Sequence, residues 1–233
     1  MTENQKLIYS KCVAELDLAD ARLSDEYYYD SLPLCIVDSV YSIGVDYPST
    51  RNTVIRYCDR ENVQRISTPL GSASDAYTVD QLLSNIAQYS DSDFGAVSLF
   101  ENRRRTSSRN GILKAEAVYR FATVLAQNGI QTLNDIRSAS AETISAIESQ
   151  IKIIPGQRSG ISFSYFLMLS GDDGHMKIDR WLLRFVGDAL GVARYNNVSQ
   201  AYEDLLVVCS ELQRTYPNLT PRLLDHTIWS YMR

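Results

Sequence analysis

The chain has 233 residues, of which 45% are hydrophobic and 22% charged, so it can bury a core and is too apolar to be disordered. Its length suits one large domain or two small lobes. The net charge of −5 argues against nucleic-acid binding if it is taken alone. However, residues 101–185 carry 12 Lys and Arg against 8 Asp and Glu, whereas the rest of the chain carries 11 against 20. A locally basic middle within an acidic protein is compatible with a face that binds nucleic acid.

Two absences in the sequence bear on its location. No stretch approaches the roughly 18 apolar residues that a membrane span requires. The N-terminal segment MTENQKLIYSK lacks the basic region and apolar core of a secretory signal. We therefore expect a cytoplasmic protein with no membrane partner, and the sequence leaves its oligomeric state open.

The cysteines are far apart, and none forms a CxxC pair or lies at metal-ligand spacing from a histidine. They are Cys12, Cys35, Cys58 and Cys209. This spacing predicts reduced, mostly buried thiols and no metal centre.

Apolar residues recur with the period of a helix throughout the chain, which predicts an all-α fold. A buried helix is expected to begin near Ser31, where Ser-Leu-Pro offers a cap and an early proline. The other expected helices cover residues 3–24, 49–59, 79–90, 113–127, 140–152, 159–169, 179–190, 198–215 and 221–232. The polar stretch ENRRRTSSRNG at 101–111 is the most exposed expected connection.

One part of the chain combines two motifs. The string IKIIPGQRSGISFSYFLMLSG has the pattern of a helix, a hairpin with Pro155-Gly156 and a second helix, and KIDRWLLRFV follows within ten residues. In this pattern the chain resembles the helix-hairpin-helix (HhH-GPD) superfamily of base-excision DNA glycosylases, in which an apolar-Asp pair, here Ile178-Asp179, opens the next helix. The segments SLPLCIVDSVYSIGV and NRRRTSSRNGILKAEA resemble a bacterial branch of that superfamily.

The resemblance covers residues 110–190 well and the N-terminal helices loosely. It implies a two-lobed, all-α fold with a cleft between the lobes, and double-stranded DNA as the partner. We expect an N-terminal helical lobe at 1–100, a helix-hairpin-helix module at 101–190 and C-terminal helices at 191–233 that pack back on the first lobe.

The hairpin and the arginine-rich loop are the expected DNA-binding elements. A tight hairpin exposes backbone N–H groups at the start of the next helix, where they and the helix dipole bind phosphate. The expected DNA-binding residues are Ile154, Pro155, Gly156, Gln157, Arg158, Ser159, Gly160, Arg103, Arg104, Arg105 and Arg109. Both segments also have simpler interpretations, since a Pro-Gly turn can merely join two helices and a charge run is typical of a solvated loop.

Asp179 is the candidate catalytic residue. Base removal requires a flipped base, and breaking its N-glycosidic bond leaves a cationic sugar that a carboxylate stabilises while it activates water. By the resemblance, Asp179 fills this role. The alternative is a helix N-cap, and the two roles are compatible.

The resemblance also bears on cofactors and on strand cleavage. Bifunctional members use a lysine in the second helix of the hairpin to attack the sugar, and that position falls at Gly160. A monofunctional enzyme is therefore implied. Members with an iron–sulphur cluster use closely spaced cysteines, which this chain lacks. No cofactor is expected, apart from a monovalent cation that the superfamily hairpin often holds. Arg158 replaces the usual second glycine there, which weakens such a site or adds a phosphate contact.

The base pocket is expected to involve Asp38, Tyr41 and Ser42, which lie on a helix whose counterpart lines the pocket in relatives. Tyr41 fits a core position equally well. The implied activity is removal of a damaged or modified base, in base-excision repair or in antiviral defence against modified foreign DNA. Two rivals stay open, a non-catalytic helix-hairpin-helix module that binds DNA or protein and a hydrolase of free nucleosides or nucleotides on the same scaffold. The motifs GxSxG, HExxH, GxxxxGK[ST] and GxGxxG are missing from the sequence.

Overall fold

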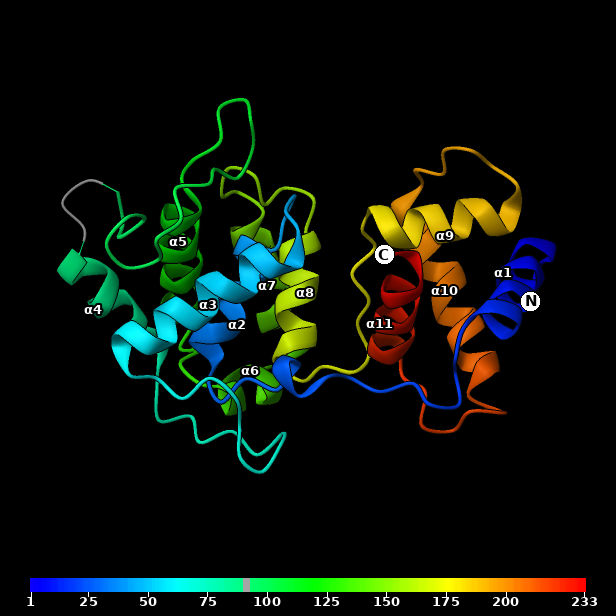
Figure 1. Cartoon of the computed structure of the whole chain (residues 1–233), viewed down its shortest axis with the longest axis horizontal. Coiled ribbons are helices and arrows are strands. Elements are labelled where there is room, and N and C mark those ends of the chain that lie inside the picture. Colours follow the sequence, from blue (N-terminus) through cyan, green and yellow to red (C-terminus); the bar gives the residue numbers. More distant parts are fainter. Residues whose placement is uncertain (90–92) are drawn as a thin grey trace. The chain divides into compact units, whose positions relative to one another are not determined.

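The computed structural model describes residues 1–89 and 93–233, and within these ranges it contains α-helices and no β-strand (Figure 1). The predicted all-α class is confirmed. In chain order the helices are α1 (Glu3–Glu15), α2 (Leu32–Tyr41), α3 (Tyr47–Glu61), α4 (Val79–Tyr89), α5 (Lys114–Gln127), α6 (Leu133–Ser138), α7 (Ala141–Ile151), α8 (Ile161–Leu169), α9 (Arg180–Leu190), α10 (Val198–Leu212) and α11 (Pro221–Met232). No helix among them is both long and apolar enough to cross a membrane.

Local start and stop signals agree with the helix ends. Asp179 caps α9 with its side chain, and Gly191 ends α9 in the left-handed conformation. Ser31 occupies the N-cap position of α2, but its hydroxyl makes no capping hydrogen bond among the described residues, so the proline in the first turn is the start signal that the structure bears out. The first helix, predicted to reach residue 24, stops at Glu15, because Leu16 adopts an extended backbone and the chain leaves the helical path there. The expected helix 79–90 is seen to Tyr89, and its last residue, Ser90, lies outside the described residues.

Helix α6 was not predicted. It has only six residues, Leu133–Ser138, which is too short for a helical period to stand out in the sequence. A capping box holds it instead: the Thr132 hydroxyl accepts the N–H of Asp135, and the Asp135 carboxylate accepts the N–H of Thr132.

The chain divides into two compact units. Unit 1 combines Met1–Ser24 with Asp172–Arg233, and unit 2 is Asp25–Gly171. These boundaries differ from the expected segments 1–100, 101–190 and 191–233. The first 24 residues belong with the C-terminal part of the chain because α1 packs against α9 and α10.

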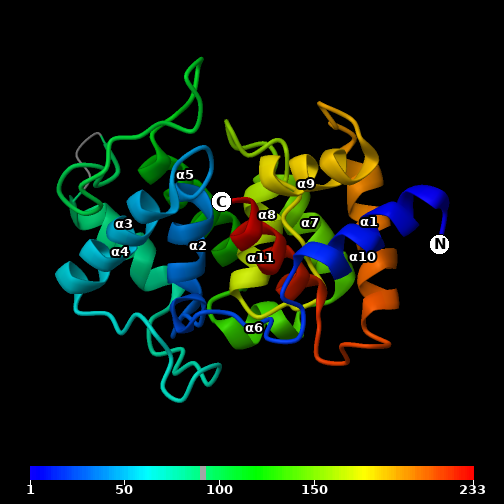
Figure 2. The same ribbon diagram turned by 45° about the vertical axis from the view of Figure 1, so that its right-hand side comes forward.

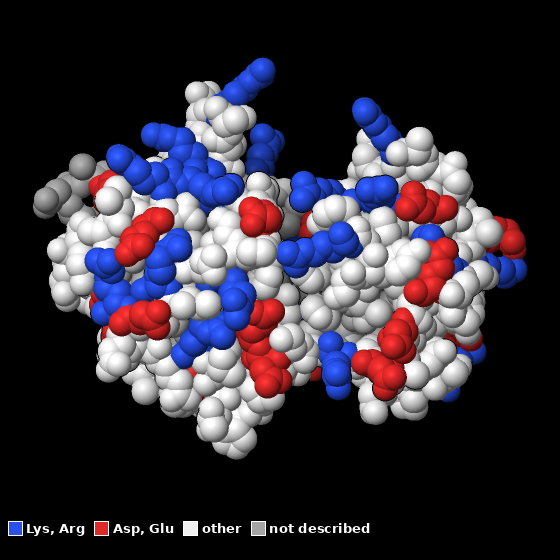
Figure 3. Space-filling model, viewed as in Figure 1, with Lys and Arg blue, Asp and Glu red and all other residues white. Residues whose placement is uncertain are grey.

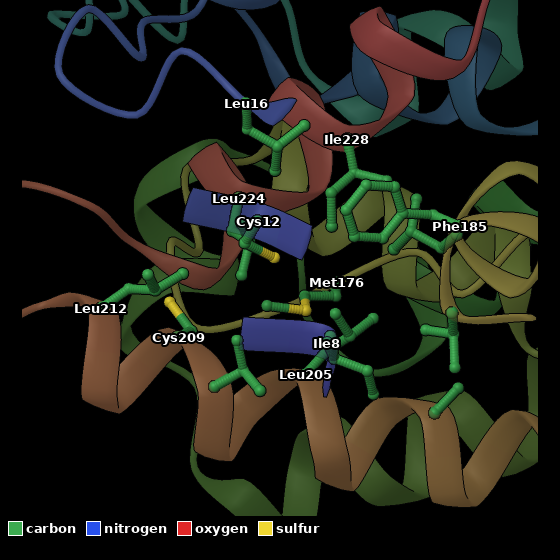
Figure 4. Packing of buried hydrophobic residues seen from close by; sticks show 14 of the residues in the cluster. Ile8, Cys12, Leu16, Met176, Phe185, Leu205, Cys209, Leu212, Leu224 and Ile228 are labelled. Atoms are coloured by element: carbon green, nitrogen blue, oxygen red, sulfur yellow. The ribbon is translucent and has the colours of Figure 1, made fainter. Parts of the chain in front are cut away.

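Unit 1 has its own hydrophobic core, to which α1, α9, α10 and α11 all contribute (Figure 4). Ile8 and Cys12 of α1 are fully buried there together with Leu205 of α10 and Leu224 of α11. Burial raises the pKa of the Cys12 thiol to about 12. All four cysteines are free and buried, so the predicted buried thiols are confirmed.

Unit 2 is built around α2, of which every residue is buried. This helix packs against α8, α5 and α3, and α5 in turn packs against α4 and α7. Phe121 of α5 meets Phe163 and Phe166 of α8, with ring centroids 6.3 and 5.0 Å away. The arginine-rich loop before α5 and the hairpin between α7 and α8 lie at the same end of this unit (Figures 1 and 2).

Candidate functional site

The hairpin between α7 and α8 consists of two successive tight turns. The N–H of Gln157 donates to the Ile154 carbonyl at 2.9 Å, and the N–H of Gly160 donates to the Gln157 carbonyl at 3.0 Å. Gly156 (φ 89°) is the left-handed residue inside the first turn, and Gly160 (φ 75°) ends the second turn in the same conformation, directly before α8. Helix α8 starts immediately afterwards, so the hairpin leads directly into a helix N-terminus.

The residues of this hairpin face in two directions. Ile154 is buried, and so is Gln157, whose side-chain oxygen accepts a hydrogen bond from the Ser162 hydroxyl. These two side chains therefore brace the hairpin from inside instead of reaching a ligand. Arg158 and Ser159 are exposed.

The loop before α5 is folded back on itself and is not an open connection. The N–H of Thr106 donates to the Ile112 carbonyl at 2.9 Å, and the Arg105 guanidinium donates to the Gly111 carbonyl at 2.8 Å. These bonds close the loop as a small hairpin of its own. Its four exposed arginines are Arg103, Arg104, Arg105 and Arg109.

The loop and the hairpin meet at Gly156. A Cβ atom on Gly156 would lie 2.3 Å from the Thr106 Cβ and 2.6 Å from its Oγ1, so Thr106 already occupies the space that a side chain would need. Two elements that are far apart in the sequence, both predicted to bind DNA, thus pack against each other within unit 2.

The arginines at this end of unit 2 differ from other arginines of the same unit in their ion pairing. Arg51, Arg56, Arg60 and Arg120 pair with glutamates at 2.6–3.5 Å. Among the described residues, no carboxylate pairs with the four loop arginines or with Arg158. Residues 101–113 and 152–160 together carry six Lys and Arg against one Glu, although unit 2 as a whole carries 13 against 16. The basic side chains gather visibly at this end (Figure 3).

Asp179 lies in unit 1, at the N-cap of α9. Its Oδ1 accepts the N–H groups of Trp181 at 2.8 Å and Leu182 at 3.4 Å. Its Oδ2 lies 3.8 Å from the Lys177 ammonium nitrogen. The cap is therefore present, and it uses only one of the two carboxylate oxygens.

A second carboxylate, which sequence analysis did not single out, lies close to this cap. Asp225 of α11 is 3% exposed, and it accepts the backbone N–H of Lys177 at 2.5 Å. Burial raises its pKa from 3.8 to about 7; the charge of Lys177 opposes this increase and that of Asp179 adds to it. The one available signal was an acidic residue inside the apolar helical string LLDHTIW.

The expected base-pocket residues are only partly brought together. Asp38 is fully buried and accepts hydrogen bonds from the hydroxyls of Tyr29 at 2.7 Å and Ser42 at 2.6 Å. Tyr41 instead packs against Phe100, with centroids 5.4 Å apart, and its hydroxyl has no hydrogen-bond partner among the described residues. Asp38 and Ser42 form one polar cluster with Tyr29, and Tyr41 belongs to the core.

Within residues 1–89 and 93–233, no three His, Cys, Asp or Glu side chains are grouped so that they could hold a metal ion. Residues 6–233 match a family described as a domain of unknown function (DUF8548). No curated protein and no solved structure matches the chain.

Proposed function

Because this chain belongs to the DUF8548 family, whose description states no activity, we propose a function from its own residues: it is a monofunctional DNA glycosylase. In this proposal it hydrolyses the N-glycosidic bond of a damaged or modified base, in base-excision repair or in defence against modified foreign DNA. The two-lobed helix-hairpin-helix glycosylase fold is part of the proposal.

The observation that carries the proposal is the packing of the arginine loop against the hairpin at Gly156. Arginines without carboxylate partners keep their full charge for phosphate oxygens, and releasing the counterions of DNA favours such contacts. Backbone N–H groups at the start of α8 suit the same ligand. The contact explains how an acidic protein holds a polyanion, since the positive charge is concentrated where the backbone donors are.

Asp179 supplies the chemistry in this proposal. The cap bonds to Trp181 and Leu182 hold one carboxylate oxygen in place, so the second oxygen can oppose the positive charge that develops on the sugar. The glycosidic C–N bond breaks, water adds its hydroxyl to the sugar carbon, and the Asp179 carboxylate accepts the other proton of that water, which passes to the nitrogen of the departing base. Glycine at position 160 offers no amine of its own. The ammonium of Lys152 lies 3.5 Å from the Cβ position of Gly160, but it is paired with Glu148 at 2.6 Å, so we assign it no attack on the sugar and expect the strand to be left intact. Asp38, with the hydroxyls of Tyr29 and Ser42, is our candidate for recognising the base.

The test uses duplex oligonucleotides, each with one modified base, followed by alkali to cleave abasic sites. We expect cleavage only after alkali. Asp179→Asn retains a capping oxygen, so it should fold and bind DNA normally but lose base release by about a hundredfold or more. Asp188→Asn, on the exposed side of the same helix, is the matched control and should keep full activity.

A second candidate function is a non-catalytic helix-hairpin-helix module. It is favoured by the geometry of Asp179, because a helix cap and an ion pair with Lys177 already account for both carboxylate oxygens. DNA binding without release of any base in the panel would select this candidate. Full activity of Asp179→Asn would reduce Asp179 to a cap, and cleavage without alkali would contradict the monofunctional assignment.

A further inference from the structure

The segment that leads into α9 is held by α11 at two points. The N–H of Arg222 donates to the Asp173 carbonyl at 3.1 Å, and the carboxylate of Asp225 accepts the N–H of Lys177 at 2.5 Å. The Arg222 guanidinium also lies 3.4 Å from the Asp173 carboxylate, and the side chains of residues 222 and 225, three apart on α11, share a face. One side of this helix thus sets the path of the chain just before Asp179.

The connection from Asp225 to Asp179 is short and continuous. Both backbone groups of Lys177 are engaged, since its N–H donates to Asp225 and its carbonyl accepts the N–H of Asp179 at 2.7 Å. The Lys177 ammonium also approaches the Oδ2 of Asp179 at 3.8 Å. We propose that Asp225 is a positioning residue that acts through Lys177 to set the orientation and the charge of the Asp179 carboxylate. This inference rests on the proposed function and names a second residue for the same site.

Electrostatics makes this link sensitive to pH. The charged groups that act on Asp225 are Lys177, which lowers its pKa, and Asp179, which raises it. Nearby on α11, Arg222 pairs with Asp173, and Asp204 of α10 is occupied by the amides of Gln5 and Gln200. Around pH 7 Asp225 therefore changes between a neutral acid and a carboxylate.

The direction of the effect follows from competition for Lys177. When Asp225 is neutral, the ammonium of Lys177 is left to offset the charge of Asp179. When Asp225 ionises, it attracts that ammonium and accepts the Lys177 N–H more strongly. Less of the negative charge of Asp179 is then offset by Lys177, and the backbone before Asp179 is held more firmly, so the carboxylate opposes a cationic sugar better. Base release should accelerate as the pH rises through about 7.

The first experiment compares pH profiles of base release for the wild type, Asp225→Asn and Asp204→Asn. We expect a several-fold rise between pH 6 and pH 8 for the wild type and for Asp204→Asn, which changes a buried aspartate of the same unit that does not touch Lys177. Asp225→Asn cannot ionise, so its profile should be flat and remain at the level of the wild type at pH 6. A rise that persists in Asp225→Asn would overturn the inference.

The second experiment does not depend on activity, and its only variant, Asp179→Asn, retains a capping oxygen and serves to assign a signal. Carbon-13 labelling of the aspartate carboxyls in the wild type follows each titration by NMR, with the Asp179 signal assigned by its loss in Asp179→Asn. We expect the chemical shift of Asp179 to change near pH 7, as Asp225 ionises. If that change is present but no base is released from any oligonucleotide, the coupling stands and the proposed function fails. If the chemical shift of Asp179 does not change near pH 7, the inference fails whatever the activity.

Discussion

Gly156 meets two separate demands in the hairpin. Its backbone is left-handed, at φ 89°, which strains any residue with a side chain. It also faces Thr106 so closely that a Cβ atom would overlap the loop. Gly129 meets only the first demand, since its φ is 73° and no atom lies within 4 Å of the Cβ position. Comparing substitutions at the two glycines therefore distinguishes the effect of backbone strain from that of the contact between loop and hairpin.

We predict that Gly156→Ala destabilises the protein more than Gly129→Ala does. Left-handed strain alone costs about 1–3 kcal/mol, and at Gly156 the displacement of the loop adds to it. Urea unfolding measures both losses. Gly156→Ala should also weaken DNA binding in the folded protein, whereas Gly129→Ala should not. Equal losses of stability and of affinity would mean that the contact with Thr106 has no consequence.

At the scale of elements, the first residue of α5 caps the end of α2. This residue, Lys114, is 1% exposed, and its ammonium donates to the carbonyls of Tyr41 at 2.8 Å and Ile43 at 2.6 Å. A positive charge at a helix C-terminus satisfies the last carbonyls and the dipole. These two bonds also fix the start of α5, and with it the end of the arginine loop, against the C-terminal end of α2. Burial first, and then the charge of Arg104, lowers the pKa of Lys114 to about 8.

We predict a stability difference between the wild type and Lys114→Met that depends on pH. Between pH 8 and about 10.5 the unfolded chain holds the Lys114 proton and the folded protein has released it, so wild-type stability rises with pH in this window relative to the variant. Buried tyrosines such as Tyr29 lower stability at high pH in both proteins, and the comparison removes that effect. Denaturant unfolding at pH 7.5, 8.5 and 9.5 measures the difference in free energy of unfolding between the wild type and Lys114→Met. A difference that stays constant with pH would contradict the lowered pKa.

At the scale of the whole molecule, charge is unevenly distributed. Both units are acidic, with 10 Lys and Arg against 12 Asp and Glu in unit 1 and 13 against 16 in unit 2. The net negative charge of both units therefore repels DNA, and the arginine loop has to overcome this repulsion. Only charges that are not already neutralised by glutamates can overcome it, and the loop and the hairpin carry such charges.

We predict that replacing Arg103, Arg104 and Arg105 together by Gln weakens binding to a duplex. The slope of the logarithm of the binding constant against the logarithm of the salt concentration should become shallower by up to about 3, one for each phosphate that an arginine no longer neutralises. The matched control replaces Arg51, Arg56 and Arg60, which are paired with glutamates, and changes the net charge equally. Fluorescence anisotropy at several salt concentrations measures both. If the two triple variants lose affinity equally, net charge and not this loop governs binding.

The sequence by itself determined the features that depend on neighbours along the chain. The helical class follows from apolar periodicity, the start of α2 after Ser31 from the proline in its first turn, and the cap at Asp179 from a side chain that bonds to the next turn. The short helix α6 was not predicted, because six residues are too few to show a helical period. The resemblance supplied the candidate Asp179 and the candidate hairpin, but it did not indicate which of their side chains are buried.

Only the tertiary structure decided the contacts between distant segments. The contact of Thr106 with Gly156, the bond from Lys177 to Asp225 and the joining of the first 24 residues to the C-terminal helices each link positions about 50 or more residues apart. No local pattern encodes such a pair, because it arises when whole helices pack and bury their apolar faces. Asp225 illustrates the limit: its position in an apolar helix was visible in the sequence, but its partner and its raised pKa come from the segment that α11 packs against.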